Sequence, residues 1–324
     1  MHVITEAHPN IALIKYWGKS GLPGNVPAVP SLPVTLGGLT TRTEAEFTDL
    51  PGDEFVMNGV SVEDARVLDC IERFRAAAGY EGGVCITTRN DFPTAAGLAS
   101  SASGFAALVG ALNGLFRLEM SPAALSVDAR RGSASAARSI HGGFVSLTGD
   151  ADDPESWQGR QIASAEHWPL EVVVAICSNA TKSVSSSEGM RASAATSPNY
   201  DSWVNGADDD YQQAHAAIQA RDFDALAHLS ESSCLKMHAL MLATQPPLIY
   251  WNAATLACIE EVRALQANGT PVFFTIDAGP QLKAVCLPDT SEAVAVALSA
   301  IDGVEEIIRS RIGGAMRVVT SETA

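Results

Sequence analysis

Residues 91–106 combine small side chains with three closely spaced hydroxyl groups. A β-type segment leads through a small-residue loop into a helical pattern, and the hydroxyl groups belong to Ser100, Ser101 and Ser103. Small residues let backbone N–H groups approach an anion, a helix N-terminus adds unpaired donors, and hydroxyls reach phosphate oxygens or Mg²⁺. The pattern indicates a phosphate-binding loop, although it matches neither GxxxxGK[ST] nor GxGxxG. The alternative is a tightly packed helix that uses Ala and Ser for close contact.

Residues 132–143 form a second small-residue helix start that contains a guanidinium group. Ser133 and Ser135 lie within one turn of Arg138, so two hydroxyls and a planar cation can converge on one carboxylate or phosphate. An arginine in this small, apolar context needs a partner, because burying an unpaired charge is costly. The alternative is a structural salt bridge.

Asp277 stands at the end of the apolar strand-like segment PVFFTI and before the turn Ala278-Gly279-Pro280. A carboxylate at this place can face a cleft, where a neighbouring cation would keep it ionised and able to accept a proton. Taken alone, Asp277 would be interpreted as a residue that makes a turn. Lysine is rare in the chain, and two of the five lysines lie in the short segment IKYWGK: Lys15, Lys19, Lys182, Lys236 and Lys283.

Other titratable residues give no comparable pattern. The seven histidines show no spacing typical of a metal site or of a Ser-His-Asp triad, so we expect them to be structural or solvent-exposed. The six cysteines lack a CxxC pair, so we expect reduced thiols in the core. The acidic run Asp208 to Asp210 precedes a helical pattern and is expected to stabilise a helix N-terminus rather than to bind a metal.

Composition limits the classes of protein that fit. The 324 residues are 47% hydrophobic and 18% charged, which indicates a globular chain with a sizeable core. Lys+Arg 21 against Asp+Glu 37 gives a net charge of −16, which disfavours nucleic acid and acidic membranes as partners. The sequence shows no secretory signal pattern and no apolar run of about 18 residues, so we expect a soluble, cytoplasmic protein.

Hydrophobic periodicity predicts a mixed α+β chain. Helical period occurs in five segments, 62–79, 98–116, 209–243, 252–269 and 291–301, and strand patterns occur in seven, 10–17, 41–48, 84–90, 142–149, 171–177, 271–277 and 282–288. Strands and helices come in clusters rather than in strict alternation, which favours mixed or antiparallel sheets covered by helices. The polar segment 149–161 is expected to be a surface connection near a domain divide, with domains at 1–170 and 171–324.

Six ordered blocks of the chain resemble the mevalonate diphosphate decarboxylases of the GHMP kinase superfamily. The blocks are NIALIKYWGK (10–19), PSLPVTL (30–36), DFPTAAGLASSASGFAAL (91–108), ARRGSASAARSIHGGFV (129–145), VSSSEGM with TSPNYDSWV (184–204) and FTIDAGP (274–280). The resemblance implies a two-lobed fold whose N-terminal half is like ribosomal protein S5 domain 2 and binds ATP, with a C-terminal half that supplies Asp277. It also implies a homodimer.

The resemblance implies ATP- and Mg²⁺-dependent conversion of mevalonate 5-diphosphate to isopentenyl diphosphate, ADP, phosphate and CO2, by way of 3-hydroxyl phosphorylation. Asp277 matches the residue that deprotonates or orients this hydroxyl, Arg138 the residue that grips the substrate carboxylate, Asn10 the residue that steadies this arginine, and Lys15 a lysine near the aspartate. Substrate and phosphate contacts are implied for Tyr16, Lys19, Ser133, Ser135, Arg138 and Ser186. The ATP loop is implied for Pro93, Ala95, Ala96, Gly97, Leu98, Ala99, Ser100, Ser101 and Ser103, with Mg²⁺ on Ser100, Ser101 or Ser103.

The chain departs from the family pattern at several positions. Ser20-Gly21 replaces a frequent Arg-Asp pair after Lys19, Ser187 stands where relatives carry Arg or Thr, and Gln281 replaces a usual Asn. The lost basic residues leave open a phosphomevalonate decarboxylase that acts on mevalonate 5-phosphate. Three further functions also stay open: a mevalonate 3-kinase without decarboxylation, a catalytically silent ligand-binding homologue and a nucleotide-binding structural protein.

Overall fold

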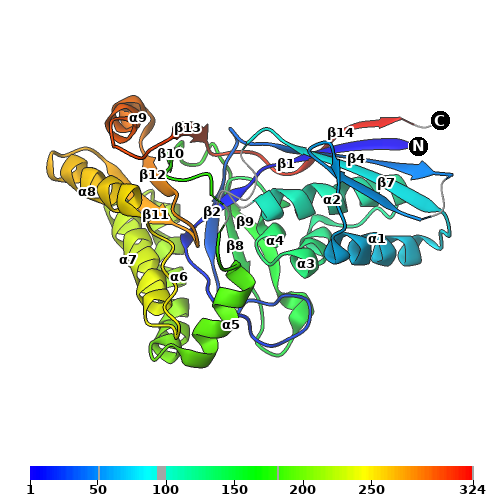
Figure 1. Ribbon diagram of the computed structural model, residues 1–324, viewed down its shortest axis with the longest axis horizontal. Helices are drawn as coiled ribbons and strands as arrows, with labels where there is room; N and C mark the ends of the chain where they lie inside the picture. Colours follow the sequence, from blue (N-terminus) through cyan, green and yellow to red (C-terminus); the bar gives the residue numbers. More distant parts are fainter. Residues whose placement is uncertain (50–51, 93–99, 181, 323–324) are drawn as a thin grey trace.

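The computed structural model describes residues 1–49, 52–92, 100–180 and 182–322, and in this part of the chain the strands form three sheets (Figure 1). The strands are β1 (His2–Ala7), β2 (Asn10–Ile14), β3 (Leu32–Thr35), β4 (Thr41–Thr48), β5 (Glu54–Met57), β6 (Val60–Ser61), β7 (Gly83–Asn90), β8 (Phe144–Thr148), β9 (Gln158–Ala163), β10 (Glu171–Ile176), β11 (Val272–Ile276), β12 (Leu282–Cys286), β13 (Glu306–Arg311) and β14 (Arg317–Glu322). The helices are α1 (Ala65–Ala78), α2 (Ser100–Phe116), α3 (Pro122–Gly132), α4 (Ala136–Ser139), α5 (Ser186–Thr196), α6 (Tyr200–Ala220), α7 (Phe223–Leu242), α8 (Ala253–Ala267) and α9 (Ser291–Ser299), with short 3₁₀ turns at Pro154–Ser156 and Pro288–Thr290.

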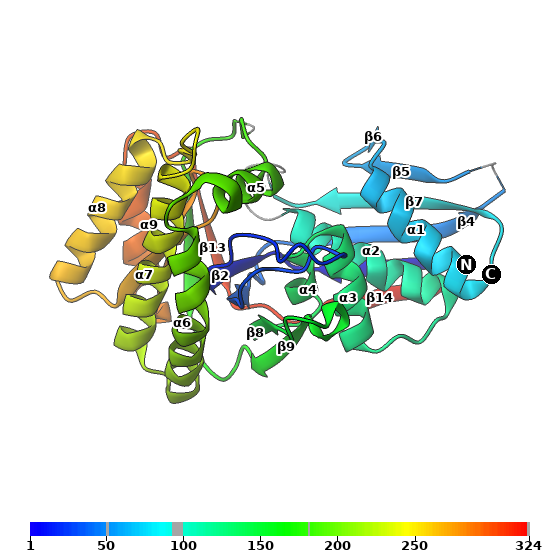
Figure 2. The same cartoon turned by 90° about the horizontal axis from the view of Figure 1, so that it is seen from below.

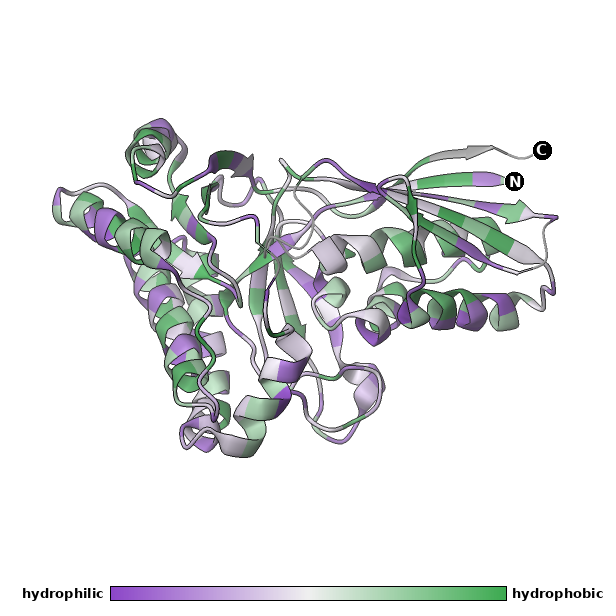
Figure 3. Ribbon diagram, in the orientation of Figure 1, coloured by the Kyte–Doolittle hydropathy of each residue, from purple (hydrophilic) through white to green (hydrophobic). Residues whose placement is uncertain are grey.

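A six-stranded sheet occupies one end of the molecule, with the order β14-β1-β4-β7-β5-β6. Neighbouring strands are antiparallel except β5 and β7, which are parallel. Helix α2 packs on β1 and β4, and α1 and α3 lie beside α2 (Figure 2). The core between this sheet and its helices is apolar and includes Val3, Ala45, Ile86, Leu108 and Leu112. Figure 3 shows the same division, because hydrophobic colour gathers on the strands and on the helix sides that meet them.

The other end of the molecule holds an antiparallel sheet with the order β11-β12-β10-β13. Helices α8 and α9 pack on this sheet, and α7 packs on both β11 and β2. All five residues of β11 and all five of β12 are buried, and all of them are apolar except Thr275 and Lys283.

A smaller sheet, β2-β3-β8-β9, lies between the two ends (Figure 1). Helix α6 contacts β2, β3 and β9, while α4 contacts β8 and β9 from the other lobe. Because β2 begins at Asn10 and ends at Ile14, Lys15 follows directly at the boundary between the two lobes. Residues 10–19, the first block of the resemblance, therefore begin in the middle sheet and lie at the centre of the molecule.

The predicted α+β fold with mixed and antiparallel sheets covered by helices is confirmed. The domain boundary at 170/171 stays a prediction, and the last strand, β14, pairs with β1 in the sheet of the N-terminal half. No helix in the described ranges is both long and apolar enough to cross a bilayer. The six cysteines carry free thiols, as expected, and all but Cys85 are buried.

Three expectations about elements were wrong. The helical segment 209–243 is two helices, because Arg221 takes a left-handed conformation (φ 56°) and the side chain of Asp222 then caps α7. The acidic run at 208–210 lies in the middle of α6, which begins eight residues earlier at Tyr200, so it caps no helix; Asp210 pairs with Lys236 on α7 instead. The segment 149–161 is a connection only as far as Trp157, since β9 starts at Gln158.

Candidate active site

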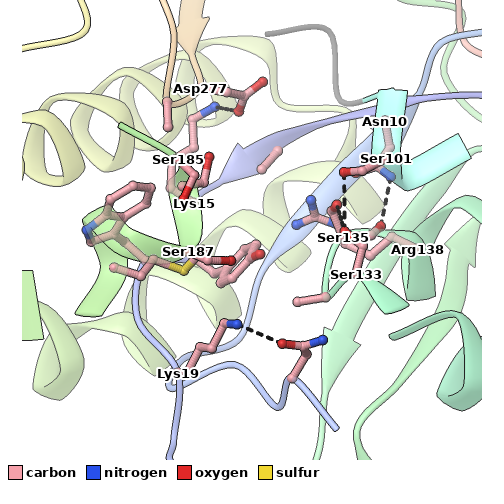
Figure 4. A pocket seen from close by; sticks show the side chains of 18 of the residues that line it. Asn10, Lys15, Lys19, Ser101, Ser133, Ser135, Arg138, Ser185, Ser187 and Asp277 are labelled. Atoms are coloured by element: carbon pink, nitrogen blue, oxygen red, sulfur yellow. Dashed lines mark hydrogen bonds and ion pairs between the residues drawn. The ribbon is translucent and has the colours of Figure 1, made fainter. Parts of the chain in front are cut away.

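A cavity of about 550 Å³ opens between the two lobes. Its wall combines the end of β2, the turn between α3 and α4, the start of α5 and the turn after β11, which are far apart in the sequence. Figure 4 shows Asp277 with Lys15 on one side of this pocket, Arg138 with Ser133 and Ser135 on another, and Lys19 below them. The fold therefore brings together the charged residues that the sequence analysis singled out.

Asp277 follows β11 directly and turns toward the pocket. The turn is closed by a hydrogen bond from Gly279 N to the Asp277 carbonyl (2.8 Å), and the hydroxyl of Thr275 donates to the carbonyl of Ala12 on β2 (3.1 Å). The neighbouring backbone of Lys15 is fixed in turn, because its N–H donates to Ser233 Oγ on α7 at 2.9 Å. Strand β11, helix α7 and the end of β2 are thus tied together at the carboxylate.

Two lysines hold the Asp277 carboxylate. Lys15 Nζ lies 2.5 Å from Oδ1, and Lys283 Nζ lies 3.1 Å from Oδ2. Each lysine side chain is only 1% exposed, whereas 27% of the Asp277 side chain is open to the pocket. Burial alone would raise the pKa of Asp277, but the two ammonium groups outweigh burial and hold this pKa far below its usual range. Burial lowers the pKa of Lys15, and the charge of Asp277 opposes that effect.

Arg138 is a buried guanidinium whose charge is not paired. Its side chain donates to Ser31 Oγ at 3.0 Å and lies over the ring of Tyr16, 5.4 Å from the ring centre. None of the described carboxylates forms an ion pair with it, and its Nε has no hydrogen-bond partner among the described residues. The alternative of a structural salt bridge at Arg138 is therefore not found in this part of the chain. Since an unpaired buried cation is costly, the arrangement fits an anionic ligand in the pocket.

Asn10 supports the backbone that carries Arg138. Its amide nitrogen donates to the carbonyl of Ser135 (3.1 Å) and to Ser139 Oγ (2.7 Å), so it holds the turn into α4 rather than the guanidinium itself. Its Oδ1 is buried and has no partner among the described residues.

Hydroxyl groups from two helices meet at the next part of the wall. Ser133 Oγ lies 3.1 Å from Ser135 Oγ and 3.3 Å from Ser101 Oγ. The turn into α4 comes this close to α2 because Gly132 has no Cβ; a Cβ there would clash with the ring of Phe105. Three hydroxyls can thus reach the same anionic group from α2 and from the turn before α4.

Ser103 belongs to the core rather than to the pocket. It is fully buried, and its hydroxyl pairs with Thr41 Oγ1 at 2.6 Å. Of the three candidate Mg²⁺ ligands, Ser101 lines the cavity, and Ser100 lines the neighbouring hollow. Pro93, Ala95, Ala96, Gly97, Leu98 and Ala99 lie outside the described residues.

Lys19 is held in the pocket by a neutral partner. Its Nζ donates to Asn25 Oδ1 at 2.7 Å, and Asn25 Nδ2 donates to the carbonyl of Arg131 at 2.6 Å. Burial lowers the pKa of Lys19, and the nearby positive charges of Arg191 and Arg66 lower it further. The ammonium group therefore keeps an uncompensated charge for an anion that enters the pocket.

Helix α5 presents its N-terminus to the cavity. Ser185 and Glu188 form a capping box, in which Ser185 Oγ accepts from Glu188 N (3.2 Å) and Glu188 Oε2 accepts from Ser185 N (3.1 Å). Ser186, a predicted site residue, lines the cavity beside Ser187. Tyr16 lines it too, and burial raises the pKa of its hydroxyl group.

Sequence reasoning missed several polar residues of this wall or its supports, among them Ser185, Ser187 and four others. Lys182 and Arg66 line the cavity, Asn25 positions Lys19, and Lys283 holds Asp277. The scarcity of lysine was the available signal for Lys182 and Lys283. Arg66 and Asn25 gave no signal, since neither lies in one of the six blocks.

A second, smaller hollow of about 170 Å³ joins the first through Arg66 and Ser101, which line both. Its wall is mostly apolar and includes Phe55, Val67 and Phe105. The pair of hollows therefore offers one apolar compartment and one cationic compartment on either side of a serine at the start of α2.

A two-lobed α+β fold with a cationic, hydroxyl-lined pocket around one carboxylate defines a class of enzymes that bind phosphorylated small molecules. Residues 7–158 match the family model of the diphosphomevalonate decarboxylase-like N-terminal domain, and residues 172–316 match that of the mevalonate 5-diphosphate decarboxylase C-terminal domain. The chain therefore belongs to the diphosphomevalonate decarboxylase family.

Individual relatives agree with this assignment. The diphosphomevalonate decarboxylase of Aspergillus fumigatus is 36% identical over 323 residues, which cover 92% of this chain and 80% of the relative. Among solved structures, the complex of MDDEF with MVAPP, AMPPCP and magnesium is similar with a TM-score of 0.91 and 34% identity, covering 99% of each chain. The mevalonate diphosphate decarboxylase from Staphylococcus aureus gives the same TM-score and identity and covers 98% of each chain. The predicted GHMP kinase-type fold is confirmed by this likeness.

Proposed function

We propose that this chain converts mevalonate 5-diphosphate and ATP to isopentenyl diphosphate, ADP, phosphate and CO2. The observation that carries the proposal is one cavity in which a lysine-paired carboxylate, Asp277, and a buried unpaired guanidinium, Arg138, face the same space. A substrate with a hydroxyl, a carboxylate and a diphosphate has one group for each part of this wall. Family membership and the matching relatives support the same reaction.

Each charged group of the wall suits one part of the substrate. We assign the 3-hydroxyl to Asp277, with Lys15 beside it, and the substrate carboxylate to Arg138, which is backed by the ring of Tyr16 and by the turn that Asn10 holds. A guanidinium stays protonated at all working pH values, so it holds the carboxylate without protonating it. An unprotonated carboxylate is required, because a protonated acid would not release CO2.

The diphosphate of the substrate is assigned to the remaining cations and hydroxyls. Lys19 supplies an uncompensated charge, and the N-terminus of α5 adds backbone donors. The hydroxyl groups are those of Ser133, Ser135 and Ser186. Lys19 and the N-terminus of α5 thus supply positive charge close to Ser187, which lines the cavity, and to Ser20. The resemblance implies basic side chains at these two positions in relatives.

The reaction divides into two steps that ask different things of the wall. In the first, the 3-hydroxyl oxygen forms a bond to the terminal phosphorus of ATP while the bond from that phosphorus to ADP breaks and ADP leaves. The hydroxyl proton passes to the Asp277 carboxylate, and the enzyme contributes mainly positioning and charge neutralisation. In the second, the C–O bond breaks with its electron pair leaving on phosphate, so that a transient tertiary cation forms at C3. The electron pair of the bond between the carboxylate and its neighbouring carbon then forms the double bond as CO2 departs.

Nucleotide and Mg²⁺ fit the second hollow and its border. The apolar hollow suits a planar base, and Ser100 and Ser101 lie where the phosphate chain would pass into the cationic cavity. The described residues contain no cluster of three or more His, Cys, Asp or Glu side chains suited to a metal, so Mg²⁺ would be held by phosphate oxygens together with a serine hydroxyl. When bound, Mg²⁺ neutralises phosphate charge.

We further propose that the chain works in the cytoplasm as a homodimer. The six free thiols suit a reducing compartment.

Sedimentation equilibrium of the purified protein tests the assembly: a mass of twice 33.9 kDa supports a dimer, and a monomer contradicts it.

The activity is tested by incubating purified protein with ATP, Mg²⁺ and either mevalonate 5-diphosphate or mevalonate 5-phosphate, while ADP and CO2 are followed together. We expect equal amounts of ADP and CO2 with the diphosphate and little product with the monophosphate. Preference for the monophosphate would overturn the proposed substrate, ADP without CO2 would indicate a kinase, and neither product would overturn the proposal as a whole.

A further inference from the structure

Asp277 is held by a second lysine that no block of the resemblance contains. Lys283 lies on β12, directly opposite Thr275 in the register of β11 and β12, two residues before Asp277. From there its Nζ reaches Asp277 Oδ2 at 3.1 Å, while Lys15 reaches Oδ1 at 2.5 Å from the end of β2. The two carboxylate oxygens are thus held by two different strands.

One lysine would be enough to balance the charge of Asp277. With Lys15 and Lys283 both protonated, the three side chains carry a net charge of +1, although each lysine side chain is only 1% exposed. A second buried cation costs folding free energy, because its desolvation must be offset by a partner that it has to share. The additional positive charge does not help a purely structural ion pair. It does help a site that receives phosphate groups, because it attracts their negative charge.

The geometry also fixes the rotation of the carboxylate. A carboxylate held through one oxygen can turn about the bond from Cβ to Cγ, but contacts at both oxygens, from Lys15 after β2 and from Lys283 on β12, remove this freedom. Catalysis by positioning depends on such restraint, since small displacements of a reacting group cost large factors in rate.

We propose that Lys283 is a positioning residue of this site, which acts through Asp277 by fixing its carboxylate and by making the group of Lys15, Asp277 and Lys283 cationic toward the transferred phosphate. This inference rests on the proposed function. It predicts that Lys283 contributes to kcat more than to substrate binding.

The kinetic test compares Lys283→Met, Lys283→Arg and wild type. We expect Lys283→Met to lower kcat by about 10- to 100-fold, with a change in KM for mevalonate 5-diphosphate below about 3-fold. Lys283→Arg keeps the charge and should recover part of kcat. Lys236→Met is the matched control, because it removes a lysine from an exposed ion pair with Asp210 on the outer helices and should leave kcat unchanged. A Lys283→Met enzyme with wild-type kcat would overturn the proposal.

A second measurement needs no turnover. Asp277→Asn leaves two buried ammonium groups without their carboxylate, so removing Lys283 from that variant relieves a repulsion. We expect the change in Tm caused by Lys283→Met to be more positive in the Asp277→Asn background than in wild type, by at least about 2 °C. Equal changes in both backgrounds would mean that Lys283 and Asp277 are not coupled, which overturns the inference.

The two tests separate the failure of the inference from the failure of the proposed function. If wild type releases no CO2 from mevalonate 5-diphosphate, the proposed function fails, and the thermal cycle still decides whether Lys283 and Asp277 form one charged unit. Without coupling in that cycle, the inference fails whatever the activity.

Discussion

Replacing Asp277 with asparagine removes the negative charge between Lys15 and Lys283. We expect turnover to fall by at least about 10³-fold, because no other described carboxylate lines this cavity. Nucleotide binding should persist, since the apolar hollow is lined by other residues. Coupled release of ADP and CO2 measures the first effect, and calorimetric titration with a non-hydrolysable ATP analogue measures the second. Near-normal turnover in a folded variant would refute the role of Asp277.

The same substitution should lower the free energy of unfolding. Two buried ammonium groups would lose the carboxylate that they share, and breaking a buried ion pair costs about 3 kcal/mol at the lower end of the usual range, which suits a carboxylate that is 27% exposed. Urea unfolding of wild type and Asp277→Asn at pH 7 measures the difference. A variant as stable as wild type would show that one of the lysines is neutral in the folded protein.

His238 makes stability depend on pH. Burial lowers the pKa of this imidazole from 6.5 to about 4 and outweighs the carbonyl of Ile276, which lies 3.3 Å from Nε2 and favours the protonated ring. A folded-state pKa below the unfolded one means that its contribution is complete above pH 6.5 and is lost as pH falls toward 4. At pH 4.5 we expect this loss to be roughly 2 to 3 kcal/mol relative to pH 7.

The check is urea unfolding at pH 7 and pH 4.5 for wild type and for His238→Gln. The variant has no titrating ring, so its stability should fall less between the two pH values, while carboxylates elsewhere affect both proteins alike. Equal losses in the two proteins would show that His238 is protonated without penalty.

At the scale of single residues, the sequence predicts the site where a rare residue type falls in a distinctive local setting. Asp277 before a Gly-Pro turn and Arg138 among small residues are of this kind, and both line the cavity. Lys283 could not be assigned in this way, because it lies in an apolar strand and its partner is set by the register of β11 against β12. The role of Asn25 could not be predicted either, because it depends on where the loop of Asn25 meets the end of α3.

The loop between Lys19 and β3 positions the ammonium group of Lys19 through Asn25. Asn25 takes a positive φ of 59°, which places its amide between Lys19 and the carbonyl of Arg131. We expect Asn25→Asp to raise the KM for mevalonate 5-diphosphate by about 10-fold with a smaller change in kcat, since a carboxylate would pair with Lys19 and compete with the substrate.

Aspartate tolerates the left-handed conformation, so the variant tests charge rather than backbone strain. Asn25→Gly keeps the conformation without adding a charge and serves as the control, with a smaller expected effect on KM. A wild-type KM in Asn25→Asp would mean that Lys19 does not hold the substrate.

Gln281 links two elements of the site. Its side chain is fully buried; Oε1 accepts from Cys177 N and Nε2 donates to the carbonyl of Ser178, both at 2.6 Å. The turn after β11 is thereby tied to the segment that follows β10 and leads to Lys182. Gln281→Ala leaves the buried N–H of Cys177 and the partly buried carbonyl of Ser178 without this partner, so we expect a loss of about 2 kcal/mol in stability and about 10-fold in kcat.

Thermal unfolding and steady-state kinetics measure both effects. Gln219→Ala is the matched control, because Gln219 donates to one exposed carbonyl, that of Ile162, outside the cavity. If Gln281→Ala kept the kcat of wild type, the tie between the two segments would have no role in catalysis.

Among the elements, strongly periodic segments were predictable and short or polar ones were not. Strand β4 and helix α1 follow their patterns closely, because each has one face on a core. Helix α5 opens with a serine-rich segment of low apolar content, so its formation depends on the Ser185 capping box and on packing against α7. The break at Arg221 was hidden because both flanking helices have the same period.

For the whole molecule, β14 covers the outer edge of β1 and is itself the last strand on that side of the six-stranded sheet. Removing residues 317–324 would expose the backbone groups of β1 along that edge, from His2 to Glu6. We expect a loss of about 3 kcal/mol or more in the free energy of unfolding and a greater tendency to associate, since several hydrogen bonds of about 1 kcal/mol each are lost and β1 replaces β14 as an unpaired edge strand.

Thermal unfolding and light scattering of the shortened chain measure these changes. An unchanged Tm and a monodisperse sample would show that β14 contributes nothing to the sheet. Removal of the two residues 323–324 alone is the control, and it leaves β14 complete.

The pairing of β1 with β14 has a consequence during synthesis on the ribosome. Translation runs at about 5 to 20 residues per second, so the partner of β1 emerges roughly 15 to 60 seconds after β1 itself. Throughout that time β1 can pair with β4 but keeps its other edge open to the crowded cell. During this time a chaperone, or another nascent chain on the same mRNA, can bind the edge of β1 that β14 later occupies.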